Sequence, residues 1–147
     1  RDIQQLTRIP CVNFSVGLSK PDLNSIQQDI MPPVKGYDAS PVIVASCPIK
    51  KEIPALQEDH ESFFRALSDQ VIQWAEAQDI DACIGYFAKP WETEKQATHL
   101  AALAYVGDFN TLMEYQEMFK RGSRANFYPM IKPEMIDRAV DIALERA

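Results

Sequence analysis

The chain has 147 residues, with 21 acidic and 15 basic side chains, and its formal net charge is −6 at pH 7. Its basic residues cluster only at Lys120, Arg121 and Arg124, which argues against a nucleic-acid partner. No apolar run approaches the ~20 residues that span a bilayer, so we expect no membrane partner. The length suits one domain that buries about 68–70% of its unfolded surface. We therefore expect a single α/β domain over residues 1–147.

Three segments have the pattern of β-strands. Residues 11–18 alternate between apolar and small or polar side chains, which is typical of a strand with one buried face. Residues 42–47 and 82–88 are short apolar runs next to prolines, and such runs suit strands covered on both faces. The connections between the three segments each contain a predicted helix and are long enough for parallel crossovers. We expect a small three-stranded sheet, parallel or mixed.

Helical spacing of apolar residues predicts five helices, at residues 19–31, 59–78, 93–106, 108–121 and from Pro133 to the C-terminal end. Ser19 is the expected cap of the first helix, and Thr93 with Gln96 has the spacing of a capping box. Gly107 and Gly122 are expected to end the third and fourth helices. The residues expected to face inward are Leu23, Ile26, Ile30, Phe63, Phe64, Leu67, Val71, Trp74, Ala75, Leu100, Leu103, Phe109, Leu112, Met113, Gln116, Phe119, Ile136, Val140, Ala143 and Leu144. The predicted fold class is α/β, with the sheet packed against helices and a helical C-terminal third.

Negative charge is concentrated in residues 52–81. This window holds eight acidic residues and one basic residue, Arg65, which leaves 13 acidic and 14 basic residues elsewhere. A local acidic field steers a basic partner toward the surface that carries it, although an ordinary solvated face has the same composition. The candidate partner-binding residues are Glu58, Glu61, Asp69, Glu76, Asp79 and Asp81.

The sequence carries no motif for catalysis, metal binding or a cofactor. The acids around His60 are consecutive and point in different directions, so they suit a helix start better than a metal site. Cys47 follows a buried run and has only His60 and His99 as conceivable bases, so a structural cysteine is favoured over a catalytic thiol. His99 is expected at the surface or boundary of its helix. The glycines are isolated, so no phosphate-binding loop is predicted. We expect no catalytic residue, no metal and no cofactor.

The three cysteines lie within or at the end of apolar runs, which favours reduced thiols and a cytoplasmic location. The chain starts with Arg1, so a further part of a longer protein is conceivable. Oligomeric state stays open, because the aromatic residues Trp91, Phe127 and Tyr128 suit a core as well as an interface.

The C-terminal third resembles small bacterial domains of unknown function, some of which are similar to immunity proteins that neutralise toxins. The residues that carry this resemblance are the run from His99 to Ala104, Gly107, Asp108, Tyr115, Gln116, Phe119, Pro129 and the run from Ile136 to Ala139. The resemblance implies no individual functional residue. It is compatible with the acidic window, since an inhibitor of a nuclease presents negative charge to a basic cleft.

These observations favour a non-enzymatic protein-binding domain, in its most concrete form an immunity-type inhibitor that binds a basic toxin through the acidic surface. One alternative is a small enzyme or metabolite-binding domain with a pocket at the strand ends near Cys47, Lys89 and Trp91. A second alternative is a regulatory domain of a longer chain.

Overall fold

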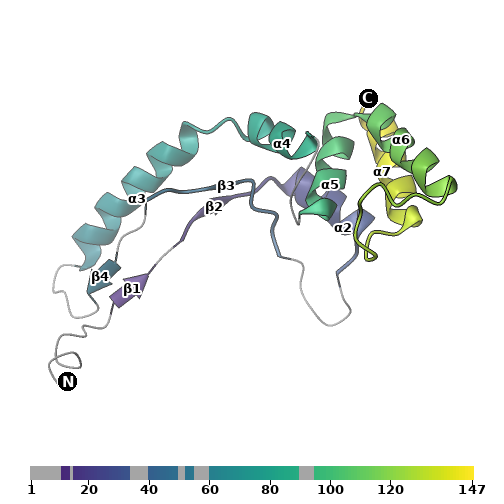
Figure 1. The fold of residues 1–147 in the computed structure, drawn as a ribbon. Helices are drawn as coiled ribbons and strands as arrows, with labels where there is room; N and C mark the ends of the chain where they lie inside the picture. Colours follow the sequence, from purple (N-terminus) through teal and green to yellow (C-terminus); the bar gives the residue numbers. More distant parts are fainter. Residues whose placement is uncertain (1–10, 14, 34–39, 50–51, 55–59, 90–94) are drawn as a thin grey trace, which may run out of the picture. The chain divides into compact units, whose positions relative to one another are not determined.

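Helices make up most of the structure, and the strands are short (Figure 1). The computed structural model describes residues 11–13, 15–33, 40–49, 52–54, 60–89 and 95–147. In chain order the elements are β1 (Cys11–Asn13), β2 (Gly17–Leu18), α2 (Pro21–Ile30), β3 (Ala45–Ser46), β4 (Glu52–Pro54), α3 (His60–Glu76), α4 (Ile80–Ala88), α5 (Gln96–Val106), α6 (Phe109–Lys120) and α7 (Pro133–Arg146).

The chain divides into two compact units. The N-terminal unit consists of Arg1–Leu18 and Ala45–Gln78, and it contains the strands together with α3. The helical unit consists of Ser19–Val44 and Asp79–Ala147, and it contains α2 and α4 to α7. The N-terminal unit is therefore built from two separate stretches of sequence.

The strands of the N-terminal unit form two antiparallel pairs. In the first pair β1 lies beside β4, with Asn13 opposite Glu52, and in the second β2 lies beside β3, with Gly17 opposite Ser46. The backbone N–H of Cys47 also donates to the carbonyl oxygen of Val16 at 2.8 Å. The expected three-stranded parallel or mixed sheet is wrong, because the described strands pair only two by two and only antiparallel.

The α/β assignment fails because the third expected strand, residues 82–88, is helix α4. Asp79 caps this helix, since its carboxylate Oδ1 accepts a hydrogen bond from the Ala82 N–H at 3.1 Å. An unbroken apolar run has no periodicity that separates a buried strand from a buried helix. The capping residue before the run favours the helix. In a helix, the residues of the run form backbone hydrogen bonds with one another and need no neighbouring strand.

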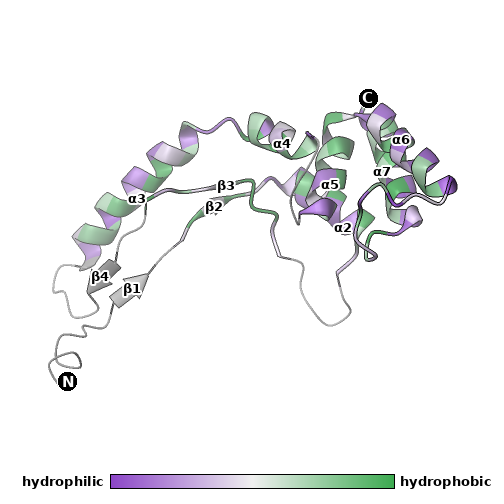
Figure 2. Cartoon of the chain, in the orientation of Figure 1, coloured by the Kyte–Doolittle hydropathy of each residue, from purple (hydrophilic) through white to green (hydrophobic). Residues whose placement is uncertain are grey.

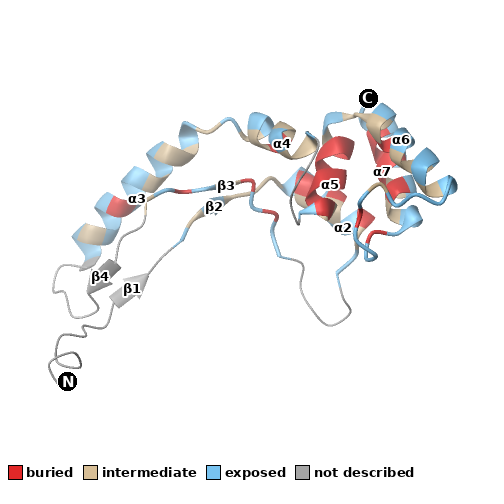
Figure 3. Cartoon of the chain, in the orientation of Figure 1, coloured by how far each residue is buried: buried red, intermediate tan, exposed pale blue. Residues whose placement is uncertain are grey.

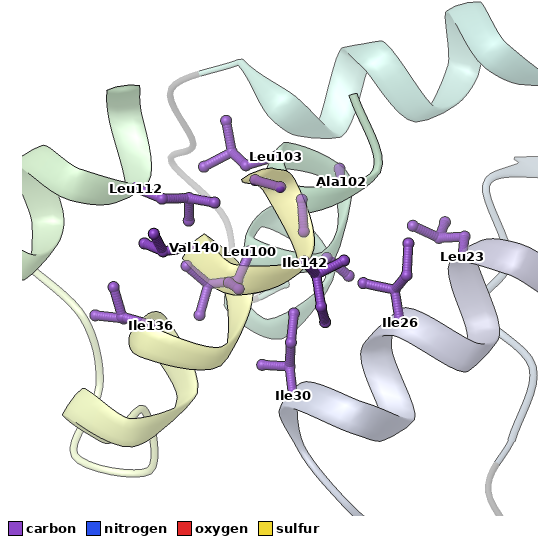
Figure 4. Close-up of a cluster of buried hydrophobic side chains, with 14 of the residues drawn as sticks. Leu23, Ile26, Ile30, Leu100, Ala102, Leu103, Leu112, Ile136, Val140 and Ile142 are labelled. Carbon is purple, nitrogen blue, oxygen red and sulfur yellow. The ribbon is translucent and has the colours of Figure 1, made fainter. Parts of the chain in front are cut away.

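The core of the helical unit is centred on α5. This helix packs against α2, α4, α6 and α7, and Figure 3 shows it buried over most of its length. Its residues Leu100 to Ala104 have no exposed surface, as expected for a helix that is apolar on every side. Figure 4 shows side chains from α2, α5, α6 and α7 that point into one cluster. The labelled members are Leu23, Ile26, Ile30, Leu100, Ala102, Leu103, Leu112, Ile136, Val140 and Ile142.

The helix ends of the C-terminal part follow the sequence signals. Gly107 ends α5 with a left-handed φ of 76°, and Asp108 caps α6 by accepting from the Thr111 N–H at 3.2 Å. Gly122 follows α6 with a φ of 84°, and Pro133 begins α7. These predictions are confirmed. The expected cap Ser19 is wrong, because Lys20 precedes Pro21 as the N-cap of α2, and Thr93 lies outside the described residues.

Most of the predicted inward faces are confirmed, with exceptions at helix edges. Leu144 is 48% exposed, while its neighbours Ile142 and Ala143 are buried. Met113 and Phe64 are also exposed. Their positions lie at the edge of an apolar stripe, where a shift of the packing direction by a fraction of a turn moves a side chain into solvent.

Gly85 provides a test of the helical assignment of residues 80–88. A Cβ atom added at Gly85 meets nothing within 4 Å, so substitution there reports backbone preference. Because alanine is the better helix former, Gly85→Ala should raise the free energy of unfolding by about 0.5–1 kcal/mol, and Gly85→Val should raise it less. Urea denaturation followed by circular dichroism measures both. A strand would give the reverse order, with valine the more stabilising residue.

Candidate partner-binding surface

Three of the predicted acidic residues share one exposed side of α3. Glu61, Asp69 and Glu76 are all exposed, and at 3.6 residues per turn their positions fall within about 80° of one another around the helix axis. Arg65 lies in the same stripe and its Nη2 contacts Glu61 Oε1 at 3.0 Å. Both side chains of this pair are largely exposed, so it neutralises Glu61 only weakly. Asp69 and Glu76 make the stripe predominantly negative.

An apolar side chain sits within this acidic stripe. Ile72 is 52% exposed and lies three residues after Asp69 and four before Glu76, so both acids are its neighbours on the helix surface. Figure 2 shows hydrophobic and hydrophilic residues alternating along α3. The opposite side of α3 carries the buried Leu67 and the half-buried Val71 and Trp74. An exposed apolar residue flanked by charged side chains matches the composition of an interface anchor with its polar rim.

The remaining acidic candidates have other roles. Asp79 is the cap of α4, and Asp81 accepts hydrogen bonds from the Lys20 ammonium at 2.8 Å and the Tyr105 hydroxyl at 2.7 Å. The hydrogen bond from Lys20 holds the pKa of Asp81 below its usual value. Both residues belong to the helical unit, whereas α3 belongs to the N-terminal unit. Glu58 lies outside the described residues. Of the five predicted residues that the structure describes, three therefore share a surface on α3 and two belong to the helical unit.

His99 is buried, so its expected place at the helix surface is wrong. Only 1% of its surface is exposed. Its Nδ1 lies 2.7 Å from the Phe87 carbonyl oxygen, and its Nε2 lies 2.9 Å from the Tyr115 hydroxyl. A carbonyl oxygen only accepts, so Nδ1 carries the proton and Nε2 of the neutral ring accepts from Tyr115. Burial lowers the pKa of His99 below 6.5, which favours this neutral form. The imidazole joins the end of α4 to α6.

A sequence signal for this burial exists. After Gln96, the other residues of the helix that contains His99 are apolar or small on every side, so the helix has no charged or strongly polar face that could hold His99 in water. The neighbouring polar residue Gln96 is also buried: its Oε1 accepts from the Tyr128 N–H at 2.8 Å, and its Nε2 donates to the Asn126 carbonyl oxygen at 3.4 Å. Both side chains fasten other segments to α5.

A second network organises the loop between α6 and α7. The Arg124 guanidinium donates through Nη2 to the carbonyl oxygens of Tyr128 and Ile131, at 2.7 and 2.6 Å. This loop contains two non-glycine residues in the left-handed region, Ala125 with a φ of 50° and Asn126 with a φ of 66°. The hydrogen bonds from Arg124 and Gln96 hold the loop in this strained conformation.

The described residues of the enzyme alternative lie in different units, and Lys89 follows a helix instead of a strand. Cys47 is buried in the N-terminal unit, while Lys89 follows helix α4 in the helical unit. Trp91 lies outside the described residues. A surface depression does occur along the exposed face of α6. Its described lining is Asn110, Met113, Glu114, Glu117, Met118 and Arg121.

Two further searches cover the described ranges only. Within them, no group of three or more histidine, cysteine, aspartate or glutamate side chains is arranged to hold a metal ion. None of the helices in the same ranges combines the length and apolar character that crossing a membrane requires.

Comparison with known proteins places the chain in a family. The model of a family described as "Family of unknown function (DUF6990)" matches residues 2–144. The chain belongs to DUF6990. This match covers both units, whereas the resemblance drawn from the sequence concerned only the C-terminal third. The DUF6990 chain has no match among proteins of curated function or among solved structures. The predicted resemblance to domains of unknown function is thus confirmed. The similarity to immunity proteins is not part of this finding.

The buried His99 predicts a loss of stability in mild acid. Its folded-state pKa is lowered, so below about pH 6.5 the unfolded chain binds more protons than the folded chain. The free energy of unfolding should therefore be highest above pH 6.5 and fall as the pH drops from about 7.5 to 5.5. Urea denaturation at several pH values in this window measures the slope.

Substitution separates His99 from the other titrating groups. His99→Leu should lose about 1–3 kcal/mol at pH 7.5, because the Phe87 carbonyl and the Tyr115 hydroxyl lose a partner, and its profile should be flatter than that of the wild type. Tyr115→Phe is the control, since it removes a hydrogen bond but keeps the titrating ring. An unchanged slope in His99→Leu would contradict the assignment.

Proposed function

We propose that this DUF6990 chain is a non-enzymatic protein-binding domain that presents the acidic stripe of α3 to a basic partner. The observation that carries the proposal is the exposure of Ile72 between Asp69 and Glu76 on one side of α3. The negative side chains attract and orient a basic surface, and Ile72 supplies apolar contact at the centre. The proposal involves no catalytic residue and no cofactor.

The charge distribution supports a directed rather than a general attraction. Residues 52–81 carry a net charge of −7 within a chain whose total is −6. Two acids of this window, Asp79 and Asp81, are engaged as a helix cap and in an ion pair. The acids of the α3 stripe, apart from Glu61 with Arg65, retain exposed carboxylates for an incoming cation. Exposed charges of this kind act mainly on the association rate and weaken with salt.

The finer form of this proposal is an immunity-type inhibitor. In it, the basic partner is a toxin whose nucleic-acid-binding cleft is occluded by the α3 stripe. Occlusion needs no chemistry from this chain. It requires only that the acidic stripe and Ile72 contact the same surface that the toxin uses for its substrate.

Charge reversal on α3 tests the surface assignment. The tagged full chain is used to capture partners from a lysate of the native host, first in low and then in high salt, and the affinity of any captured protein is measured by calorimetry. Asp69→Lys combined with Glu76→Lys should weaken binding by about tenfold or more and reduce its salt dependence, because like charges then face the partner.

The matched control reverses two acids on another exposed helix. Glu114→Lys with Glu117→Lys on α6 changes the net charge by the same amount, and it should leave the affinity close to the wild-type value. Equal losses in both double variants would show a non-specific charge effect. No loss in the α3 variant would remove α3 as the binding surface.

Substitution of Ile72 tests the apolar part of the proposed interface. Ile72→Ala should weaken binding by about tenfold while leaving the salt dependence unchanged, since it removes apolar contact and no charge. Ile43 is a suitable comparison, because it is another exposed isoleucine outside α3. An Ile43→Ala variant should bind like the wild type. If Ile72→Ala also bound like the wild type, Ile72 would not belong to the interface, and only the charged residues of the stripe would remain in it.

The inhibitor form is tested on the captured partner. If that protein degrades nucleic acid, equimolar wild-type chain should abolish the degradation, and the Asp69→Lys, Glu76→Lys variant should inhibit only at about tenfold higher concentration. Binding without any loss of the partner's activity would retain the protein-binding proposal and exclude inhibition.

A further inference from the structure

The polypeptide passes between the two units three times, after Leu18, after Val44 and after Gln78. In the helical unit, a residue near each crossing makes a hydrogen bond to a distant part of the chain. Lys20 follows the first crossing, Val42 precedes the second and Asp81 follows the third. We call the segments 19–24, 41–44 and 79–84 the three roots.

The first and third roots are joined by an ionic network. The Lys20 ammonium contacts Asp81 Oδ1 at 2.8 Å and also donates to the Tyr105 hydroxyl, which itself donates to Asp81 Oδ1 at 2.7 Å. Arg146 holds Tyr105 in place, because its Nε donates to the Tyr105 carbonyl oxygen at 3.0 Å and its guanidinium lies 4.5 Å from the ring centroid. Four separate segments of the helical unit thus meet at Tyr105.

The second root is fastened to the same turn of α2. The backbone N–H of Val42 donates to Asn24 Oδ1 at 2.8 Å, and the Asn24 N–H donates to the Lys20 carbonyl oxygen at 3.0 Å. Asn24 therefore lies one helical turn from Lys20, a rise of about 6 Å. All three roots converge on the first turn of α2.

Burial differs between the roots and the network that joins them. Each root is anchored in the core by an apolar side chain, Leu23 in the first, Val44 in the second and Ile84 in the third. The ion pair itself is open to water, with 32% of the Lys20 side chain and 66% of the Asp81 side chain exposed. Salt therefore reaches the ion pair directly, while the core is insensitive to it.

We propose that Lys20, Asp81 and Tyr105 form an ionic clasp that fixes the starting points of the first and third connections to the N-terminal unit. With the clasp closed, the connections begin together at the first turn of α2. When salt or a substitution opens it, the exposed ends of the first and third roots fray back to Leu23 and Ile84, and the chain in these two connections becomes longer. The second root does not lengthen, because its buried anchor Val44 is the last residue before the crossing. The clasp is a salt-sensitive conformational device and does not depend on the proposed partner binding.

Hydrogen–deuterium exchange of the full chain tests the clasp. It is measured by mass spectrometry at about 10 mM and about 1 M salt, between which the Debye length falls from about 30 to about 3 Å. At low salt, Asp81→Asn should raise exchange in the first and third roots by about two- to fivefold, with the second root, α5 and α7 unchanged. High salt should do the same to the wild type and add little to the variant.

The matched control is a second exposed ion pair on α2. Arg138 contacts Asp29 through Nη2 and Oδ2 at 2.6 Å, so Asp29→Asn removes a similar pair that joins α2 to α7 away from the crossings. It should leave exchange in the roots unchanged. If exchange in the Asp81→Asn variant rose only in residues 79–84, the substitution would affect α4 locally, and the clasp would be wrong. An even rise across the whole helical unit, or no rise, would equally overturn the clasp.

Discussion

The burial of the central part of α5 is the constraint on which the helical unit depends. A helix with no exposed surface from Leu100 to Ala104 must be surrounded on every side, and α2, α4, α6 and α7 supply that cover. Small residues within α5 let its neighbours approach closely, while Leu100 and Leu103 fill the spaces between them. Because this cover is drawn from both ends of the sequence, the stretch that contains α2 must fold together with the C-terminal helices.

The burial of α5 also determines where polar side chains act. The side chains of Gln96 and His99 are buried, so each satisfies its polar atoms with groups from segments that pack on α5. The cost of leaving a buried polar atom unpaired makes these contacts specific. Gln96 fixes the loop before α7, and His99 fixes the end of α4 relative to α6. The polar residues therefore select one arrangement of helices among those that apolar packing alone would permit.

Acidic residues that are adjacent in sequence serve separate purposes in the fold. Glu61, Asp69 and Glu76 face solvent on α3, whereas Asp79 and Asp81 take part in the start of α4 and its contact with α2. The boundary between the two units falls after Gln78, within the acidic window. A charge cluster in sequence is therefore not equivalent to a charge cluster on one surface. The exposed Ile72, which composition does not reveal, is the feature of the α3 stripe on which the proposed interface rests.

The sequence by itself determined the helices that begin and end on local signals. Gly107, Asp108, Gly122 and Pro133 fix the ends of α5, α6 and α7 through backbone conformation and capping, which depend on a few adjacent residues. The amphipathic stripes of α2 and α3 were equally readable, because their periodicity reflects one buried side. Of the candidate site, Glu61, Asp69 and Glu76 were predictable as an exposed face for the same reason.

Tertiary structure decided the place of His99 and the division of the acidic window, and it decided the fold class together with the local cap at Asp79. Residues 82–88 are apolar without a period, so only their packing against α5 and the cap at Asp79 make them a helix. Strand pairing likewise depends on partners that lie 27 to 43 residues apart in the sequence, which no local pattern specifies. The role of Asp81 follows from Lys20 and Tyr105, which are remote in sequence and meet only when α2, α4 and α5 have packed.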